Sequence, residues 1–114
     1  MIFKIYHNPR CGKSRNTLAI LNEKGVEVEI VEYLKDSPSK SELESIITKL
    51  GVKPLDLIRK GETVFKEEYK GKELSDSEWI EVMVSNPILI ERPIVVKNDK
   101  AVIGRPPENV LNLL

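Results

Sequence analysis

The chain has 114 residues, of which 40% are hydrophobic and 32% are charged. This length predicts a single domain over residues 1–114, with enough apolar sequence for a core that needs neither a disulfide nor a structural metal. Its 18 basic and 18 acidic side chains give a formal net charge of zero. Because a neutral chain has no global attraction for anionic polymers or surfaces, neither nucleic acid nor a membrane is expected as a partner.

The expected compartment follows from the cysteine count and from the apolar runs. The chain has one cysteine, whereas a secreted domain of this size more often carries an even set that forms disulfides. Its N-terminus has no charged and apolar regions of a signal peptide, and no apolar run approaches the roughly 20 residues of a membrane span. We therefore expect a monomeric protein in the reducing cytoplasm.

The N-terminal segment is predicted to form a strand, a loop and a helix. Pro9 and Gly12 mark the loop, and Ser14 is the expected N-cap of a helix that ends at Gly25. The apolar residues that indicate the strand and then the helix are Ile2, Phe3, Ile5, Tyr6, Leu18, Ile20 and Leu21.

Cys11, the only cysteine, is thereby predicted at or just before a helix N-terminus. The unpaired N–H groups and partial positive charge there favour a thiolate, and Arg10, Lys13 and Arg15 add cationic charge to the loop. The same N–H groups suit a tetrahedral oxyanion held against the sulfur. We therefore expect an accessible cysteine that is nucleophilic near neutral pH.

Three better-known loop types do not fit these residues. A phosphate-binding P-loop ending in Gly12, Lys13 and Ser14 would need a glycine where the chain has His7. A cysteine phosphatase loop would need an arginine where the chain has Thr17. A Cys-x-x-Cys redox motif would need a second cysteine at Ser14, so one thiol cannot complete that redox cycle within the chain.

The next segments are predicted to be a strand and then a series of helices. Residues 26–31 alternate apolar and acidic side chains, the pattern of a strand with one buried face. Residues 62–73 are a charged stretch expected to be solvated. One helix is expected to open with the capping-box residues Ser39 and Glu42 and to stop at Gly51. A short helix follows over residues 54–59. A third helix is expected to open with the capping-box residues Ser75 and Glu78 and to end at Asn86.

The C-terminal segment returns to sheet. Residues 93–96 and 101–103 are predicted to pair as an antiparallel hairpin around Asn98 and Asp99. Pro107 is suited to open a last helix that runs through Val110, Leu111 and Leu114. The element order predicts an α/β protein with a thioredoxin-like fold, a mixed sheet of about four strands and an enlarged helical insertion over about residues 39–86.

Three separated stretches resemble the glutaredoxin-coupled arsenate reductases and their arsenate-reductase-like relatives. The first is Tyr6-His7-Asn8-Pro9 with Cys11-Gly12 and Ser14-Arg15-Asn16-Thr17-Leu18, which resembles the family's active-site loop. The second runs from Asn86-Pro87 into Arg92-Pro93, and the third is Gly104-Arg105-Pro106-Pro107. Arg10, Lys13 and the end at Leu114 resemble the family's uncharacterised branch more closely than its best-characterised members.

The resemblance implies a role for each site residue. Cys11 would attack arsenate as a thiolate, and Arg59, Arg92 and Arg105 would hold the oxyanion. His7 and Ser14 would tune the thiolate, and Pro93 would be the cis proline that thioredoxin-like folds set opposite the active cysteine. Glutathione as co-substrate would then displace arsenite, and glutaredoxin would clear the resulting mixed disulfide. No bound cofactor or metal is implied.

Two other functions are compatible with the sequence. One is an Spx-like regulator of the same fold that binds RNA polymerase, although such regulators usually carry a Cys-x-x-Cys switch where this chain has Ser14. The other is a general glutathione-dependent thiol oxidoreductase with no specificity for arsenate.

Overall fold

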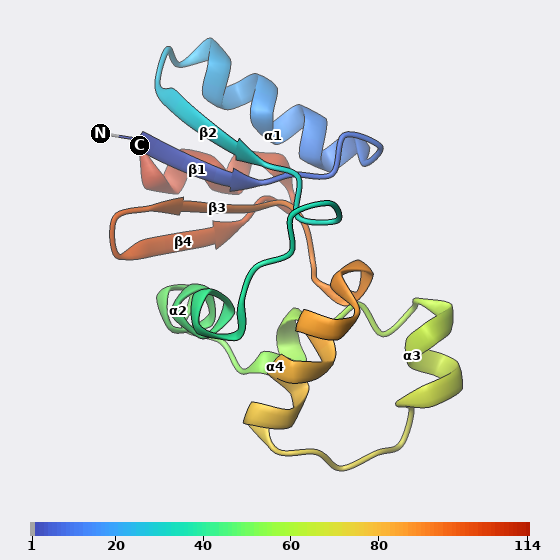
Figure 1. Cartoon of the computed structure of the whole chain (residues 1–114). Helices are drawn as coiled ribbons and strands as arrows, with labels where there is room; N and C mark the ends of the chain where they lie inside the picture. Colours follow the sequence, from blue (N-terminus) through green and yellow to red (C-terminus); the bar gives the residue numbers. More distant parts are fainter. Residues whose placement is uncertain (1) are drawn as a thin grey trace. The chain divides into compact units, whose positions relative to one another are not determined.

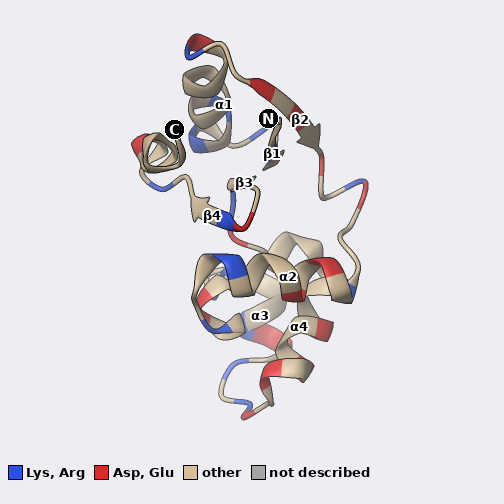
Figure 2. Ribbon diagram, turned by 90° about the vertical axis from the view of Figure 1, so that its left-hand side faces the viewer, with Lys and Arg blue, Asp and Glu red and all other residues tan. Residues whose placement is uncertain are grey.

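The computed structural model describes residues 2–114, which form two compact units (Figure 1). One unit combines residues 2–36 with Arg92–Leu114, and the other is Ser37–Glu91. Basic and acidic residues are interspersed along the ribbons of both units, in keeping with a net charge of zero (Figure 2). Among residues 2–114, every helix is too short or too polar to cross a membrane.

The first unit is built on a mixed four-stranded sheet with the order β2-β1-β3-β4. β1 pairs in parallel with β2 and antiparallel with β3, and β3 forms an antiparallel hairpin with β4. This confirms the predicted α/β class, the mixed sheet and the hairpin. The strands are β1 (Ile2–Tyr6), β2 (Glu27–Val31), β3 (Ile94–Lys97) and β4 (Lys100–Ile103).

One face of the sheet is covered by α1 (Gly12–Glu23) and the 3-10 helix η3 (Pro107–Leu113), which pack against each other. The core at this face joins side chains from β1, α1, β3 and η3, namely Phe3, Ile5, Leu21, Val95, Val110 and Leu113. Burial of these apolar side chains is the main stabilising contribution in the unit, and it fixes the end of α1 relative to the ends of the strands.

Two elements bury only part of their apolar residues. Val28 in β2 packs against the core, as the alternating pattern predicted. Ile30 in β2 is 51% exposed, because β2 is an edge strand of which only part is covered. In η3 the buried residues are Val110 and Leu113, whereas Leu111 and Leu114 are exposed. A 3-10 helix has three residues per turn, so Val110 and Leu113, three apart, share a face.

The second unit is helical. Ser39 Oγ accepts the Glu42 N–H at 3.1 Å at the start of α2, and Ser75 and Glu78 form a reciprocal capping box at the start of α4. Both helix starts are therefore confirmed, and the predicted stop at Gly51 is a left-handed C-cap with φ +70°. The helices are α2 (Lys40–Leu50), η1 (Pro54–Leu57), α3 (Thr63–Glu68), α4 (Asp76–Ser85) and η2 (Pro87–Leu89).

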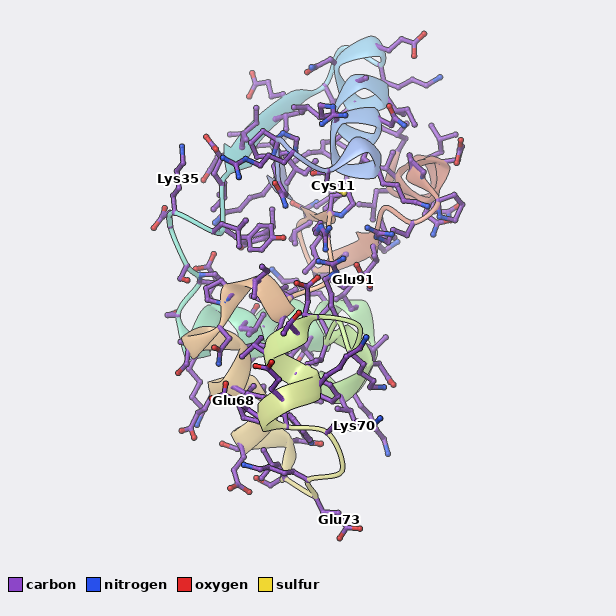
Figure 3. The ribbon with its side chains drawn as sticks, turned by 90° about the vertical axis from the view of Figure 1, so that its right-hand side faces the viewer. Cys11, Lys35, Glu68, Lys70, Glu73 and Glu91 are labelled. Atoms are coloured by element: carbon purple, nitrogen blue, oxygen red, sulfur yellow. The ribbon has the colours of Figure 1, made fainter. Side chains whose placement is uncertain are left out.

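The helix α3 lies in the stretch expected to be only a charged, solvated face. Lys70 and Glu73 are exposed, and their side chains project outward (Figure 3). Phe65, in contrast, is buried with its ring centroid 6.0 Å from that of Trp79. Trp79 of α4 also contacts Tyr69, the C-cap residue of α3, so aromatic packing organises a segment that its sequence shows only as charged.

Candidate functional site

Cys11 lies at the N-terminal end of α1, where the sequence placed it, and is the N-cap residue of that helix (Figure 3). Its backbone is extended, with φ −95° and ψ 122°, and its carbonyl accepts the Arg15 N–H at 3.0 Å as the first hydrogen bond of the helix. The sulfur therefore lies at the positive end of the helix dipole, near the unpaired N–H groups of the first helical turn.

The loop before Cys11 is held by Asn8 and Arg15. The carbonyl of Asn8 accepts the Cys11 N–H at 3.0 Å, and its side-chain Oδ1 accepts the Arg10 N–H at 3.0 Å. Arg15 Nη1 donates to the Pro9 carbonyl at 2.9 Å. Arg15 is thus tied to the loop backbone, a structural use that its charge alone did not predict.

Ser14 is not the N-cap of the helix, contrary to the sequence prediction. It lies inside the first turn of α1 and is fully buried. Its Oγ accepts the Asn8 N–H at 3.0 Å and lies 2.6 Å from His7 Nδ1. The helix starts three residues earlier because the backbone turn at Asn8 already orders the chain, and the Ser14 hydroxyl is directed to that turn.

His7 is 6% exposed, and its environment favours the neutral imidazole. Burial lowers the pKa of His7 below its usual value; Glu32 opposes this shift and Arg15 adds to it. Ser14 Oγ lies within hydrogen-bond distance of His7 Nδ1 and also accepts the Asn8 N–H, so one hydroxyl joins the imidazole to the loop backbone. Through Ser14, His7 is linked to the loop that carries Cys11.

The lowered pKa of His7 predicts that acid destabilises the fold. In the unfolded chain His7 takes up a proton near its ordinary pKa of 6.5, whereas the folded chain resists protonation until a lower pH. The stability contribution is therefore complete above pH 6.5 and is lost as the pH falls through the folded-state pKa. Urea unfolding at pH 7.5 and pH 5.5 should show a larger loss for the wild type than for His7→Gln. Equal losses would contradict this assignment.

Arg105 is the arginine that the structure brings to the thiol. Its Nη2 donates to Cys11 Sγ at 3.7 Å, and its Nε donates to the carbonyl of Arg92 at 2.8 Å. A guanidinium beside a sulfur nucleophile presents planar donors and a permanent positive charge to any oxyanion bonded to that sulfur.

Arg92 and Pro93 precede β3 in the same unit. The Arg92–Pro93 peptide is cis, and so is Arg105–Pro106, for which the sequence offered no signal. Pro93 is buried, and its carbonyl accepts the Gly104 N–H at 2.9 Å. The Nε and Nη1 atoms of Arg92 are also buried.

Gly104 is a site residue that the sequence reasoning missed. A Cβ at this position would lie 2.5 Å from Thr17 Oγ1 and 2.8 Å from Pro93 Cγ. Thr17 is itself fully buried, and its hydroxyl donates to the Lys13 carbonyl at 2.8 Å. Only glycine allows the turn before Arg105 to approach α1 this closely. A single glycine among several gives no such signal without the tertiary structure.

Gly104→Ala is expected to lower the free energy of unfolding by about 1–3 kcal/mol, the usual effect of overpacking a rigid site. The added methyl must displace Thr17 or Pro93. Chemical denaturation would measure the change. Gly61→Ala is the matched control, because a Cβ there has no neighbour within 4 Å and the backbone is not left-handed. Equal stability of the two variants would show that the close approach is not maintained in solution.

Arg59 lies in the second unit, where two carboxylates engage its side chain. Its Nη1 is 2.7 Å from Glu62 Oε2, and its Nε is 3.8 Å from Glu91 Oε1. The geometry within each unit therefore joins Arg105 to Cys11 but gives no such contact for Arg59. Its oxyanion-binding role stays a prediction.

The exposure of Cys11 differs from the sequence expectation. The residue is only 9% exposed, although Arg10 and Lys13 on either side of it are exposed. The basic neighbours of Cys11 in the sequence led to the expectation that it is accessible. In the structure the side chains of these neighbours are exposed while that of Cys11 is buried. Within residues 2–114, no three His, Cys, Asp or Glu side chains gather as a metal site would require.

Comparisons with known proteins agree on one family. The model of the ArsC family matches residues 6–113. The chain is 49% identical to a protein of Escherichia coli K12 named "Uncharacterized protein YfgD", over 97% of this chain and 95% of that protein. It is 45% identical to an arsenate reductase of Rhizobium meliloti, over 100% of this chain and 82% of that one.

The solved structures show the same likeness. An arsenate reductase from Vibrio cholerae superimposes with a TM-score of 0.96 at 45% identity, covering 100% of this chain and 98% of that one. A putative arsenate reductase from Yersinia pestis gives a TM-score of 0.91 at 43% identity, covering 96% and 98%. The predicted thioredoxin-like fold is confirmed by these neighbours. Since the family model covers nearly all of the sequence, including the cysteine loop and the Gly104–Arg105 turn, this chain belongs to the ArsC family.

Proposed function

We propose that this protein reduces arsenate to arsenite at Cys11. The observation that carries the proposal is the 3.7 Å contact between Arg105 Nη2 and Cys11 Sγ at the N-terminus of α1. A tetrahedral oxyanion bonded to this sulfur would meet a guanidinium and helical N–H groups. The names of the R. meliloti and V. cholerae relatives support arsenate as that oxyanion.

In the first step the Cys11 thiolate attacks arsenic. An S–As bond forms, and one arsenic–oxygen bond breaks, its oxygen leaving as water after protonation. Arsenic stays pentavalent in this cysteine-bound adduct. Arg105 stabilises the negative charge on the remaining oxygens, with Arg92 and Arg59 in the same role, because preorganised cations lower the energy of such a charged intermediate.

The second step needs electrons from outside the chain, which has one cysteine. The thiolate of glutathione attacks the Cys11 sulfur, an S–S bond forms, and the electron pair of the S–As bond goes to arsenic. Arsenite leaves, and Cys11 remains in a mixed disulfide with glutathione. A glutaredoxin thiolate then attacks the glutathione sulfur and releases Cys11 as a thiolate. Two thiols thus supply the two electrons, and no resident cofactor takes part.

NADPH oxidation tests this cycle. Purified protein is mixed with glutathione, glutaredoxin, glutathione reductase and NADPH, and absorbance is followed with and without arsenate. We expect oxidation that requires arsenate, glutathione and glutaredoxin, each shown by omission. Arsenate-independent oxidation would exclude the proposal. Turnover of a glutathione mixed disulfide without use of arsenate would instead identify a general thiol oxidoreductase, and capture of RNA polymerase subunits would identify a regulator.

A further inference from the structure

The side chain of Asn109 bridges the turn that carries Arg105. Its Nδ2 donates to the carbonyl of Ile103 at 3.2 Å and to the carbonyl of Arg105 at 3.1 Å. The Ile103 carbonyl also accepts the Arg105 N–H at 2.9 Å, which uses both of its lone pairs. One amide group therefore fixes the backbone on both sides of Gly104.

Asn109 is itself held by the core of its unit. Its backbone N–H donates to the Pro106 carbonyl at 3.0 Å as part of η3, and the next residue, Val110, is fully buried. The packing of η3 therefore sets the position of the Asn109 amide. Through the two carbonyls it also sets the position of the Arg105 backbone.

The guanidinium of Arg105 depends on that backbone. Its Nε bond to Arg92 and its Nη2 contact with Cys11 Sγ fix only the far end of a long, flexible side chain. Holding a long, flexible side chain in one conformation costs rotamer entropy, so a fixed backbone favours the position of the guanidinium at the sulfur.

We propose that Asn109 is a positioning residue that keeps the positive charge of Arg105 beside Cys11. Use of this arrangement for arsenate rests on the function proposed above, whereas the positioning itself does not. The amide acts through Arg105 and does not touch the sulfur. Removing Nδ2 should let the Arg105 turn move and should weaken the effect of its charge on reactions at Cys11.

The test compares two alkylating reagents that differ in charge. Iodoacetate is an anion and iodoacetamide is neutral, so the ratio of their rates with Cys11 reports the positive charge near the sulfur. General loosening of the fold would raise both rates and leave the ratio unchanged. Rates are measured at several pH values for wild type, Asn109→Ala, Asn109→Leu and Arg105→Gln, with melting temperatures. Asn112→Ala, an exposed position in the same helix, is the matched control.

We expect Arg105→Gln to lower the iodoacetate-to-iodoacetamide ratio about fivefold, the effect of one unit charge at about 4 Å in water. Asn109→Ala and Asn109→Leu should lower it toward the same value, and Asn112→Ala should match wild type. Asn109→Leu fills the space of the amide and serves if the alanine variant does not fold. Combining Asn109→Ala with Arg105→Gln should give no further decrease, since both act through one charge.

Two results would overturn the proposal. One is an unchanged ratio in both Asn109 variants while Arg105→Gln lowers it. The other is an unchanged ratio in Arg105→Gln, which would place the guanidinium away from the sulfur in solution. Failure of arsenate turnover is a separate result. If the Asn109 variants lower the ratio but the wild type does not reduce arsenate, the proposed substrate is rejected and the positioning role of Asn109 stands.

Discussion

Cys11→Ser is expected to reduce arsenate-dependent NADPH oxidation to background, a loss on the order of 10⁴-fold or more, as when other enzymes lose their nucleophile. A serine hydroxyl is not ionised near neutral pH and cannot form the sulfur–arsenic bond. The same substitution should preserve the fold, because Cys11 is the N-cap of α1 and serine is a preferred N-cap residue.

The melting temperature separates these two effects. We expect Cys11→Ser to unfold at or slightly above the wild-type temperature while arsenate reduction is lost. Reduction that survives in this variant would remove Cys11 from the reaction. A large fall in melting temperature would mean that the thiol has a packing role that its position does not indicate.

Arg105→Gln is expected to lower kcat/KM for arsenate about 10²- to 10³-fold, equivalent to about 3–4 kcal/mol, the usual effect of removing one electrostatic donor from a charged transition state. The glutamine keeps a polar side chain of similar reach but has no charge to place at the 3.7 Å contact with Cys11 Sγ. Steady-state kinetics at saturating glutathione and glutaredoxin would measure the change.

Lys24→Gln provides the matched control for that substitution. Lys24 is an exposed cation at the C-terminal end of α1, so its loss changes the net charge equally without touching the site. We expect wild-type kinetics for it. If the two variants lose activity equally, the effect belongs to overall charge, and Arg105 has no special role.

The sequence predicted the secondary structure well where local chemistry is decisive. The capping residues Ser39 and Ser75 and the left-handed Gly51 act on their own turns, so their side chains and backbone preferences are enough to place helix ends. It failed at α3, where the deciding contact is between Phe65 and Trp79, which are far apart in sequence. A long-range contact of this kind leaves no local pattern.

The candidate site shows the same division. The position of Cys11 at the start of α1 could be predicted, because a loop followed by an apolar periodic segment marks a helix start. Ser14 was assigned to the wrong position, because a serine near a helix start is compatible with several turns, and its contact with His7 chooses one. Gly104 and Asn109 were missed, because glycine and asparagine are ordinary turn residues until their neighbours are known.

The sequence by itself therefore determined the order of the strands, the capped starts of α2 and α4 and the place of the single cysteine at the start of α1. Only the tertiary structure decided that Arg105 meets Cys11 across 94 positions of the chain and that Thr17, Pro93 and Gly104 leave no room for another atom. The physical reason is that hydrogen-bonded caps and hydrophobic periodicity act over a few residues. Packing distances and the approach of a charge to a thiol depend on how distant segments are brought together.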